Sequence, residues 1–142
     1  MVRVPIRRVD PSLPLPVYAT QGAAGFDFYC RDETVIEPRC LGLIPTNVVV
    51  QVPDGYVLLV ALRSGTPRRK HLLSPHGFGI IDRDYCGPED EIHVQVYNFG
   101  DQEVVIERGE RVAQGMLLPA PLVEWDQFDA ETVSRGGFGS TD

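Results

Sequence analysis

Short hydrophobic runs bounded by glycine or proline recur along the whole chain. In residues 92–99 hydrophobic and polar positions alternate, so that Ile92, Val94 and Val96 share one face of an extended segment. Further runs rich in β-branched residues occupy residues 47–52, 56–62 and 104–106. A period of two, with turn residues about every 8 to 12 positions, is typical of the strands of a β sandwich or barrel. The pattern therefore predicts an all-β fold.

Turn and helix signals complete this outline. Pro-Asp-Gly at residues 53–55 and Phe-Gly-Asp at residues 99–101 predict hairpin turns. No long amphipathic helical pattern is present, and only residues 66–73 have room for a helical turn or two. The chain has no internal repeat and no linker, which predicts one domain over residues 1–133. The Gly-rich residues 134–142 predict a flexible tail.

Charge and cysteine content narrow the range of functions. The 142 residues carry a formal charge of −7, which disfavours nucleic-acid and membrane-surface binding. A small phosphate compound remains possible if a few cations converge and a divalent metal helps. Three cysteines without zinc spacing, with no signal peptide and no apolar run long enough to span a membrane, predict a protein of the reducing cytoplasm.

Five segments carry polar residues that a plain β fold does not need. Asp27 lies between two phenylalanines, and is either a solvated acid on an edge strand or part of a site. Arg63, Ser64 and Gly65 follow an apolar run, where a guanidinium, a hydroxyl and amides suit phosphate oxygens, although Ser64 could simply cap a helix. The remaining segments are residues 79–87, with two acids and a tyrosine; residues 109–114, with Arg111 and Gln114; and the tail.

The order of these segments closely resembles that of one known family. Ala-Ala-Gly-Phe-Asp at 23–27, Arg-Ser-Gly at 63–65, Gly-Ile-Ile-Asp-Arg-Asp-Tyr at 79–85, Gly-Glu-Arg-Val-Ala-Gln at 109–114 and Gly-Gly-Phe-Gly-Ser-Thr at 136–141 resemble the five motifs of the homotrimeric dUTPases. The resemblance spans about Val17 to Thr141. It implies a β jelly roll that hydrolyses dUTP to dUMP and pyrophosphate with Mg²⁺, in trimers whose active sites combine residues of three subunits.

The resemblance also implies a role for individual residues. Asp82 would position the water that attacks the α-phosphorus, and Asp27 would hold waters of the metal–triphosphate complex. The residues implied in phosphate binding are Arg63, Ser64, Gly65, Gln114, Arg135, Ser140 and Thr141. Gln114, which would contact the α-phosphate region, is also implied as catalytic together with Asp82. The residues implied in nucleoside binding are His76, Gly79, Ile80, Ile81, Asp82, Tyr85 and Phe138. Among these, Tyr85 would exclude a 2′-hydroxyl and Phe138 would cover uracil as the tail, residues 134–142, closes like a lid.

Several positions depart from the family pattern. Arg135 lies three residues before Phe138, whereas the family arginine lies five before, where this chain has Val133. His76 replaces an asparagine, and Thr66-Pro67 replaces a leucine-led turn. Residues 88–91 (Pro-Glu-Asp-Glu) resemble an acidic insertion, which we expect to face solvent.

Two rival functions remain open from the sequence. A dCTP deaminase shares the fold but needs a glutamate base where this chain has Gln95, and it needs paired serines where this chain has only Ser64. A trimeric jelly-roll binding protein without catalysis would have no need to combine Asp27, Asp82 and Phe138. Release of pyrophosphate from dUTP distinguishes the three.

Overall fold

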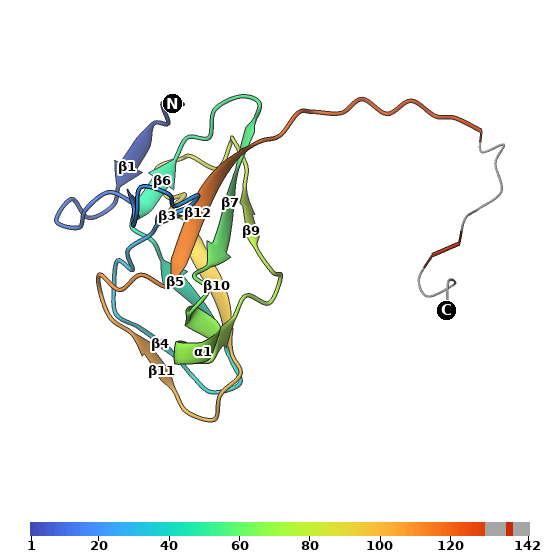
Figure 1. Ribbon diagram of the computed structural model, residues 1–142. Coiled ribbons are helices and arrows are strands. Elements are labelled where there is room, and N and C mark those ends of the chain that lie inside the picture. The colour runs from blue at the N-terminus through green and yellow to red at the C-terminus, as the bar shows by residue number, and fades with distance from the viewer. Residues whose placement is uncertain (130–135, 138–142) are drawn as a thin grey trace.

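The computed structural model describes residues 1–129 and 136–137, and in them strands predominate (Figure 1). The strands are β1 (Ile6–Arg8), β2 (Val17–Tyr18), β3 (Phe26–Asp27), β4 (Thr34–Ile36), β5 (Leu41–Pro45), β6 (Val48–Val50), β7 (Tyr56–Leu62), β8 (Leu72–Leu73), β9 (Gly79–Ile81), β10 (His93–Asn98), β11 (Val104–Ile106) and β12 (Ala113–Pro119). The helix α1 spans Thr66–Lys70. This arrangement confirms the prediction of an all-β jelly roll. No helix in the described ranges is long and apolar enough to cross a membrane.

In the residues that the structure describes, four antiparallel sheets enclose one hydrophobic core. The largest has the strand order β2-β3-β12-β7-β9, and the others are β5-β10-β8, β1-β6 and β11-β4. As the alternation predicted, Ile92, Val94 and Val96 are buried, and they pack in one cluster with residues of β6, β7 and β11. Burial of this cluster supplies the main driving force for folding.

The pairing of β3 with β12 depends on a residue without a side chain. Gly115 of β12 lies opposite Phe26 of β3. A Cβ atom at Gly115 would lie only 2.7 Å from Cε2 of Phe26 and 2.9 Å from Cε2 of Phe28. The glycine therefore lets two aromatic rings lie across β12 while the strands keep their register.

The positions of the two turns were predicted correctly, but the pairing of the strands on either side of them was not. Residues 53–55 turn between β6 and β7, and Gly55 has a φ of 77°, yet β6 pairs with β1 while β7 pairs with β12 and β9. Likewise residues 99–101 join β10 to β11, which belong to different sheets. The two hairpin predictions were wrong, because a turn signal does not determine which strands pair across it. The helical segment is also shorter than residues 66–73, since β8 begins at Leu72.

Candidate active site

Asp27 is a buried acid in an interior strand. Its strand β3 lies between β2 and β12, and the residue is 4% exposed, so the alternative of a solvated edge acid is wrong. Its Oδ1 lies 3.2 Å from Nε of Arg63, and its Oδ2 lies 3.3 Å from Nη1 of Arg111. A buried carboxylate requires such partners. Asp27 thus forms ion pairs with two guanidinium groups from separate parts of the chain.

The segment Arg63-Ser64-Gly65 is tied to the start of β12. The backbone N–H of Arg63 donates to the carbonyl of Val112 (2.9 Å), and the buried hydroxyl of Thr66 donates to the same carbonyl (2.8 Å). Gly65 is the N-cap of α1, and no side chain caps the helix. The alternative in which Ser64 serves as the cap is therefore wrong. The exposed Ser64 hydroxyl makes no hydrogen bond with the described part of the chain, and is available to a ligand.

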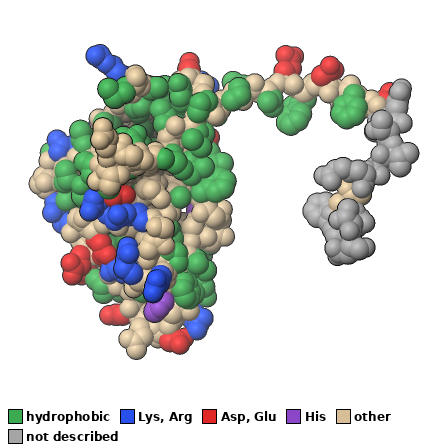
Figure 2. All heavy atoms as spheres, in the orientation of Figure 1, with side chains coloured by type: hydrophobic (Ala, Val, Ile, Leu, Met, Phe, Trp, Pro, Cys, Tyr) green, Lys and Arg blue, Asp and Glu red, His purple; other side chains and the backbone are tan. Residues whose placement is uncertain are grey.

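Arg69 is a cation beside this segment that the sequence analysis missed. Its guanidinium lies directly over Gly65, where a Cβ atom would come within 2.1 Å of Nη1. It is exposed and forms no ion pair with residues 1–129 or 136–137. Figure 2 shows Lys and Arg side chains gathered over the region of α1. The helical spacing of four residues between Gly65 and Arg69 could have revealed the contact, because such positions share a helix face.

Gln114 lies directly opposite Asp27 in the register of β3 and β12. It is also opposite Ala61 of β7, two residues before Arg63. Its Nε2 lies 3.5 Å from the carbonyl oxygen of Leu62. The central strands thereby bring three of the predicted segments, those of Asp27, Arg63 and Gln114, to one place.

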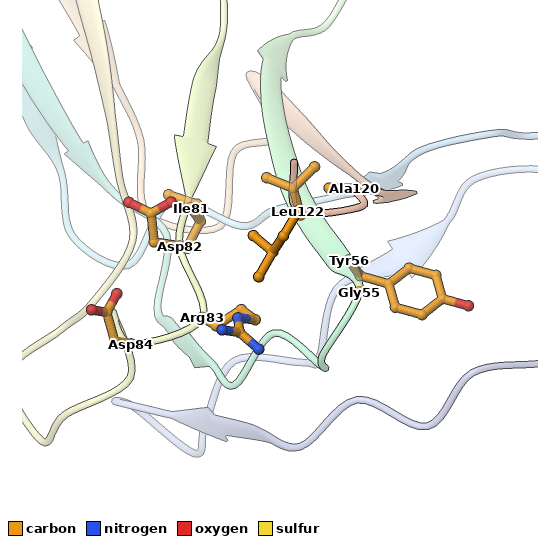
Figure 3. A pocket seen from close by; sticks show the side chains of 9 residues that line it. Gly55, Tyr56, Ile81, Asp82, Arg83, Asp84, Ala120 and Leu122 are labelled. Atoms are coloured by element: carbon orange, nitrogen blue, oxygen red, sulfur yellow. The ribbon is translucent and has the colours of Figure 1, made fainter. Parts of the chain in front are cut away.

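Asp82 follows β9 and is exposed on the margin of a cavity of about 460 Å³. Figure 3 shows the Asp82 and Asp84 carboxyl groups on one side of the chain and Arg83 on the other, towards Leu122. Arg83 forms an exposed ion pair with Asp54 (2.5 Å), which ties this turn to the one before β7. The Asp82 carboxylate therefore remains open to a ligand, with Arg83 directed elsewhere.

A smaller cavity, of about 20 Å³, lies between β7, β9 and β10. His76, Gly79, Ile81, Ser74, His93 and Gln95 contribute to its lining. The Ser74 hydroxyl and Nδ1 of His76 are 2.9 Å apart. Ile80, by contrast, is 60% exposed on the outer side of β9. The predicted base-binding residues His76, Gly79 and Ile81 thus share one hollow, and Gln95 lies in it too.

The acidic residues 88–91 do not all face solvent. Pro88 and Glu89 are exposed, but Glu91 is only 7% exposed and accepts hydrogen bonds from Arg31. The expectation of a solvated acidic segment was wrong for Glu91. Its partner Arg31 lies 60 residues away in the sequence. The run of acids therefore gave no indication that one of them forms a buried ion pair.

The predicted phosphate and water-positioning residues lie far apart within one chain. Ile81 pairs with Leu58, so Asp82 lies near the level of Val57, whereas Arg63 follows the opposite end of β7. Six residues of strand span about 20 Å. In the described part of a single chain, Asp82 and Arg63 cannot contact adjacent phosphate groups of the same ligand.

The family model described as dUTPase matches residues 12–142. The chain belongs to the dUTPase family. This confirms the family that the order of motifs suggested.

Individual dUTPases resemble the chain over most of its length. The deoxyuridine 5′-triphosphate nucleotidohydrolase of Caulobacter vibrioides (strain NA1000 / CB15N) is 40% identical, over 93% of this chain and 88% of that protein. The corresponding protein of Helicobacter pylori (strain J99) is 33% identical, over 99% of this chain and 97% of that protein.

Solved dUTPase structures share the fold. The crystal structure of the Streptococcus mutans dUTPase is 35% identical and covers 84% of this chain and 98% of its own, with a TM-score of 0.77. A mutant dUTPase of Staphylococcus bacteriophage 80alpha, solved with dUpNHpp, is 26% identical and covers 99% of both chains, with a TM-score of 0.84. These likenesses confirm the jelly-roll assignment.

The tail residues of this dUTPase fall largely outside the described ranges. These are Arg135, Phe138, Ser140 and Thr141. Of the predicted tail, residues 134–142, the structure describes Gly136 and Gly137. The roles suggested for the tail remain predictions.

The donor set of this dUTPase suits a metal that arrives with its ligand. Within the described residues, no group of three His, Cys, Asp or Glu side chains could enclose an ion. Asp27 is a single carboxylate whose two oxygens already contact arginines. Mg²⁺ commonly retains several waters and binds one or two carboxylates together with substrate phosphates. Asp27 would reach such an ion through the ion's water ligands.

Proposed function

We propose that this protein hydrolyses dUTP to dUMP and pyrophosphate, by attack of water on the α-phosphorus. The observation that carries the proposal is the ion-paired cluster of Asp27, Arg63 and Arg111, next to the available Ser64 hydroxyl and opposite Gln114. Three motif segments of the family converge there. In a cell this reaction would keep uracil out of DNA and supply dUMP.

The phosphate site combines cations, a hydroxyl and an amide. Arg63, Ser64 and Gly65 bind phosphate oxygens, and Gln114 contacts the α-phosphate region. Arg69 adds a cation that no described acid neutralises. Arg135, Ser140 and Thr141 complete the site from the tail. The segments thus concentrate positive charge in a chain whose net charge is −7.

Asp82 positions the attacking water and accepts its proton. A carboxylate within hydrogen-bond reach is sufficient for this role. Mg²⁺, held by the triphosphate and through water by Asp27, would neutralise charge that develops on the phosphate oxygens. Since phosphoryl transfer requires mostly positioning and charge stabilisation, these groups suffice for catalysis.

The nucleoside lies against the segment of β9. Backbone groups of Gly79, Ile80 and Ile81, with His76, read the uracil, and Phe138 covers it. Tyr85 packs under the deoxyribose and leaves no room for a 2′-hydroxyl. The exposed face of β9, on which Ile80 is 60% exposed, supports this placement.

We propose a homotrimer with shared active sites, working in the cytoplasm. The distance of about 20 Å between the levels of Asp82 and Arg63 supports a site to which different chains contribute them. Three is the number of chains that the family resemblance implies. This use of several subunits explains how a small domain provides motifs from opposite ends of its sheet.

The segment after β12 supports such an assembly. The carbonyl of Gly55 accepts a hydrogen bond from Ala120, beyond which residues 121–129 run away from the body (Figure 1). Leu122, Trp125 and Phe128 are each at least 87% exposed there. Large apolar side chains in such a row indicate contact with another chain. The arm would deliver the lid, residues 134–142, of one domain (1–133) to a neighbouring subunit.

The experiment is a turnover panel with dUTP, dCTP, UTP and dTTP in the presence of Mg²⁺, monitored for dUMP, pyrophosphate and ammonia. Pyrophosphate from dUTP alone supports the proposal, and ammonia from dCTP would contradict it. A deaminase is not proposed, because the amide of Gln95, although it lines the small cavity, cannot take a proton. Binding of dUTP without pyrophosphate would instead indicate a non-catalytic protein.

A further inference from the structure

Glu91 is a buried acid at the end of the segment that carries Tyr85. Its Oε1 accepts hydrogen bonds from Nε of Arg31 (2.9 Å) and from the backbone N–H of Asn47 (2.8 Å). Its Oε2 accepts one from Nη2 of Arg31 (3.0 Å). The bond to Glu91 raises the pKa of Arg31 above its ordinary value. With three donors around it, the carboxylate is held in one position.

The backbone carbonyl of the same residue holds Tyr85. The Tyr85 hydroxyl donates to the carbonyl oxygen of Glu91 at 3.1 Å. Nδ1 of His93 lies 2.9 Å from that oxygen, and since a carbonyl only accepts, Nδ1 must carry the proton. The carbonyl group of Glu91 therefore fixes the position of the Tyr85 hydroxyl, and the anchored side chain of Glu91 fixes that carbonyl.

The residues between Tyr85 and Glu91 form a closed loop. The N–H of Gly87 donates to Oδ2 of Asp90 (2.7 Å), and Nη2 of Arg7 donates to the carbonyl of Pro88 (2.5 Å). The hydrogen bond between Tyr85 and Glu91 joins the two ends of this loop. Tyr85 and Glu91 are thereby held at a fixed separation.

The hydroxyl contact with Glu91 is the one side-chain hydrogen bond of Tyr85 among the described residues. The residue is 40% exposed, and its backbone N–H donates at 3.3 Å to the carbonyl of Asp82. An exposed ring that lost its hydroxyl contact would gain rotational freedom. A site can reject a substrate that carries one extra hydroxyl group only if the side chain that blocks this group is rigid. Such a site must hold its geometry within a fraction of an ångström.

We infer that Arg31 and Glu91 are positioning residues for sugar selectivity, which act by fixing the carbonyl that holds the Tyr85 hydroxyl. The inference rests on the proposed role of Tyr85 beneath the deoxyribose. Neither residue touches the nucleotide. They determine how strictly the site rejects a ribonucleotide. Asp82, and not this pair, positions the attacking water.

The test is a double-mutant cycle on the ratio of kcat/KM for dUTP to that for UTP. Tyr85→Phe removes only the hydroxyl, and Arg31→Gln removes the charged partner of Glu91. We expect each variant to lower the ratio by about threefold to tenfold, as for the loss of one hydrogen bond. Because both act through one contact, the double variant should lose no more than the stronger single variant. UTP turnover should rise while kcat for dUTP changes less.

Two controls distinguish a positioning role of Arg31 from a general loss of stability. Arg39→Gln breaks an exposed ion pair with Asp101, outside this network, and should leave the ratio unchanged. Arg31→Lys keeps the charge and should retain part of the selectivity, while thermal unfolding monitors the fold of every variant. If Arg31→Gln fails to fold, Glu91→Gln, which keeps an acceptor for Asn47, replaces it in the cycle.

The outcomes distinguish this inference from the proposed function. An unchanged ratio in Arg31→Gln, or losses that multiply in the double variant, would overturn the positioning role while Tyr85 remains the selectivity residue. An unchanged ratio in Tyr85→Ala would overturn the role of Tyr85 itself, and the inference with it. Hydrolysis of dUTP is measured in the same assays and is judged independently.

Discussion

Asp27 and Gln114 face each other across the antiparallel pair of β3 and β12. The register places the Asp27 carboxylate where Arg63, just after β7, and Arg111, just before β12, reach it. The glycine at position 25 leaves room for the Gln114 side chain, because a Cβ atom there would lie 2.9 Å from its Oε1. Three motif segments are therefore held as one unit, so that a change in Asp27 should affect all of them.

Replacement of Asp27 by asparagine should lower both stability and activity. The variant leaves two guanidinium groups without their buried counter-charge, and we expect a loss of about 1–3 kcal/mol in the free energy of unfolding. Urea denaturation measures it. Asp84→Asn, an exposed acid, is the matched control and should unfold like the wild type. An Asp27→Asn protein as stable and active as the wild type would contradict the role of the cluster.

Replacement of Asp82 by asparagine should separate binding from chemistry. The amide keeps the shape of the side chain but cannot accept the proton of the water, so kcat should fall about a hundredfold to ten-thousandfold. The Kd for the non-hydrolysable dUpNHpp should stay within a few-fold of the wild-type value, as calorimetry would show. A kcat close to that of the wild type would remove Asp82 from the mechanism.

Shared active sites predict complementation between inactive variants. When Asp82→Asn and Arg63→Gln chains are coexpressed with different tags, mixed trimers should contain sites with one intact contribution from each. Each mixed trimer would then have one restored site in three, about a third of the sites, since the contacts between subunits are heterologous. The activity of doubly purified trimers measures this. Activity no greater than that of the separate variants would contradict sharing between chains.

Truncation after residue 133 should remove activity without unfolding the domain. The last core strand, β12, ends at Pro119, so the midpoint of thermal unfolding should change little. Loss of a closing lid should lower kcat/KM for dUTP sharply, since closure excludes water and completes the site. A truncated protein that turns over dUTP normally would refute the lid.

The three thiols should react in the order of their exposure. All are free, with Cys40 exposed, Cys86 partly buried and Cys30 buried. Burial also raises the pKa of the Cys30 thiol, so at mildly alkaline pH less of it is the reactive thiolate. Labelling followed by mass spectrometry should find Cys40 modified first and Cys30 only in denaturant. Early labelling of Cys30 in the native protein would show that the segment after β3 opens locally.

The sequence by itself determined the class of fold and the family. Alternation identified β10, the apolar runs identified β6, β7 and β11, and the order of five short motifs identified the family. These features are local, because side-chain period and turn residues depend only on neighbours in the chain. Local signals also placed the turns at residues 53–55 and 99–101.

Only the tertiary structure decided which groups are partners. Turn residues could not show that β6 and β7 enter different sheets, and the acidic run at residues 88–91 could not show that Glu91 is buried against Arg31. The same holds for Asp27, which lies 36 and 84 positions before Arg63 and Arg111 in the chain. Burial and pairing depend on strand register between distant segments, and a slip of one residue would turn each side chain to the opposite face.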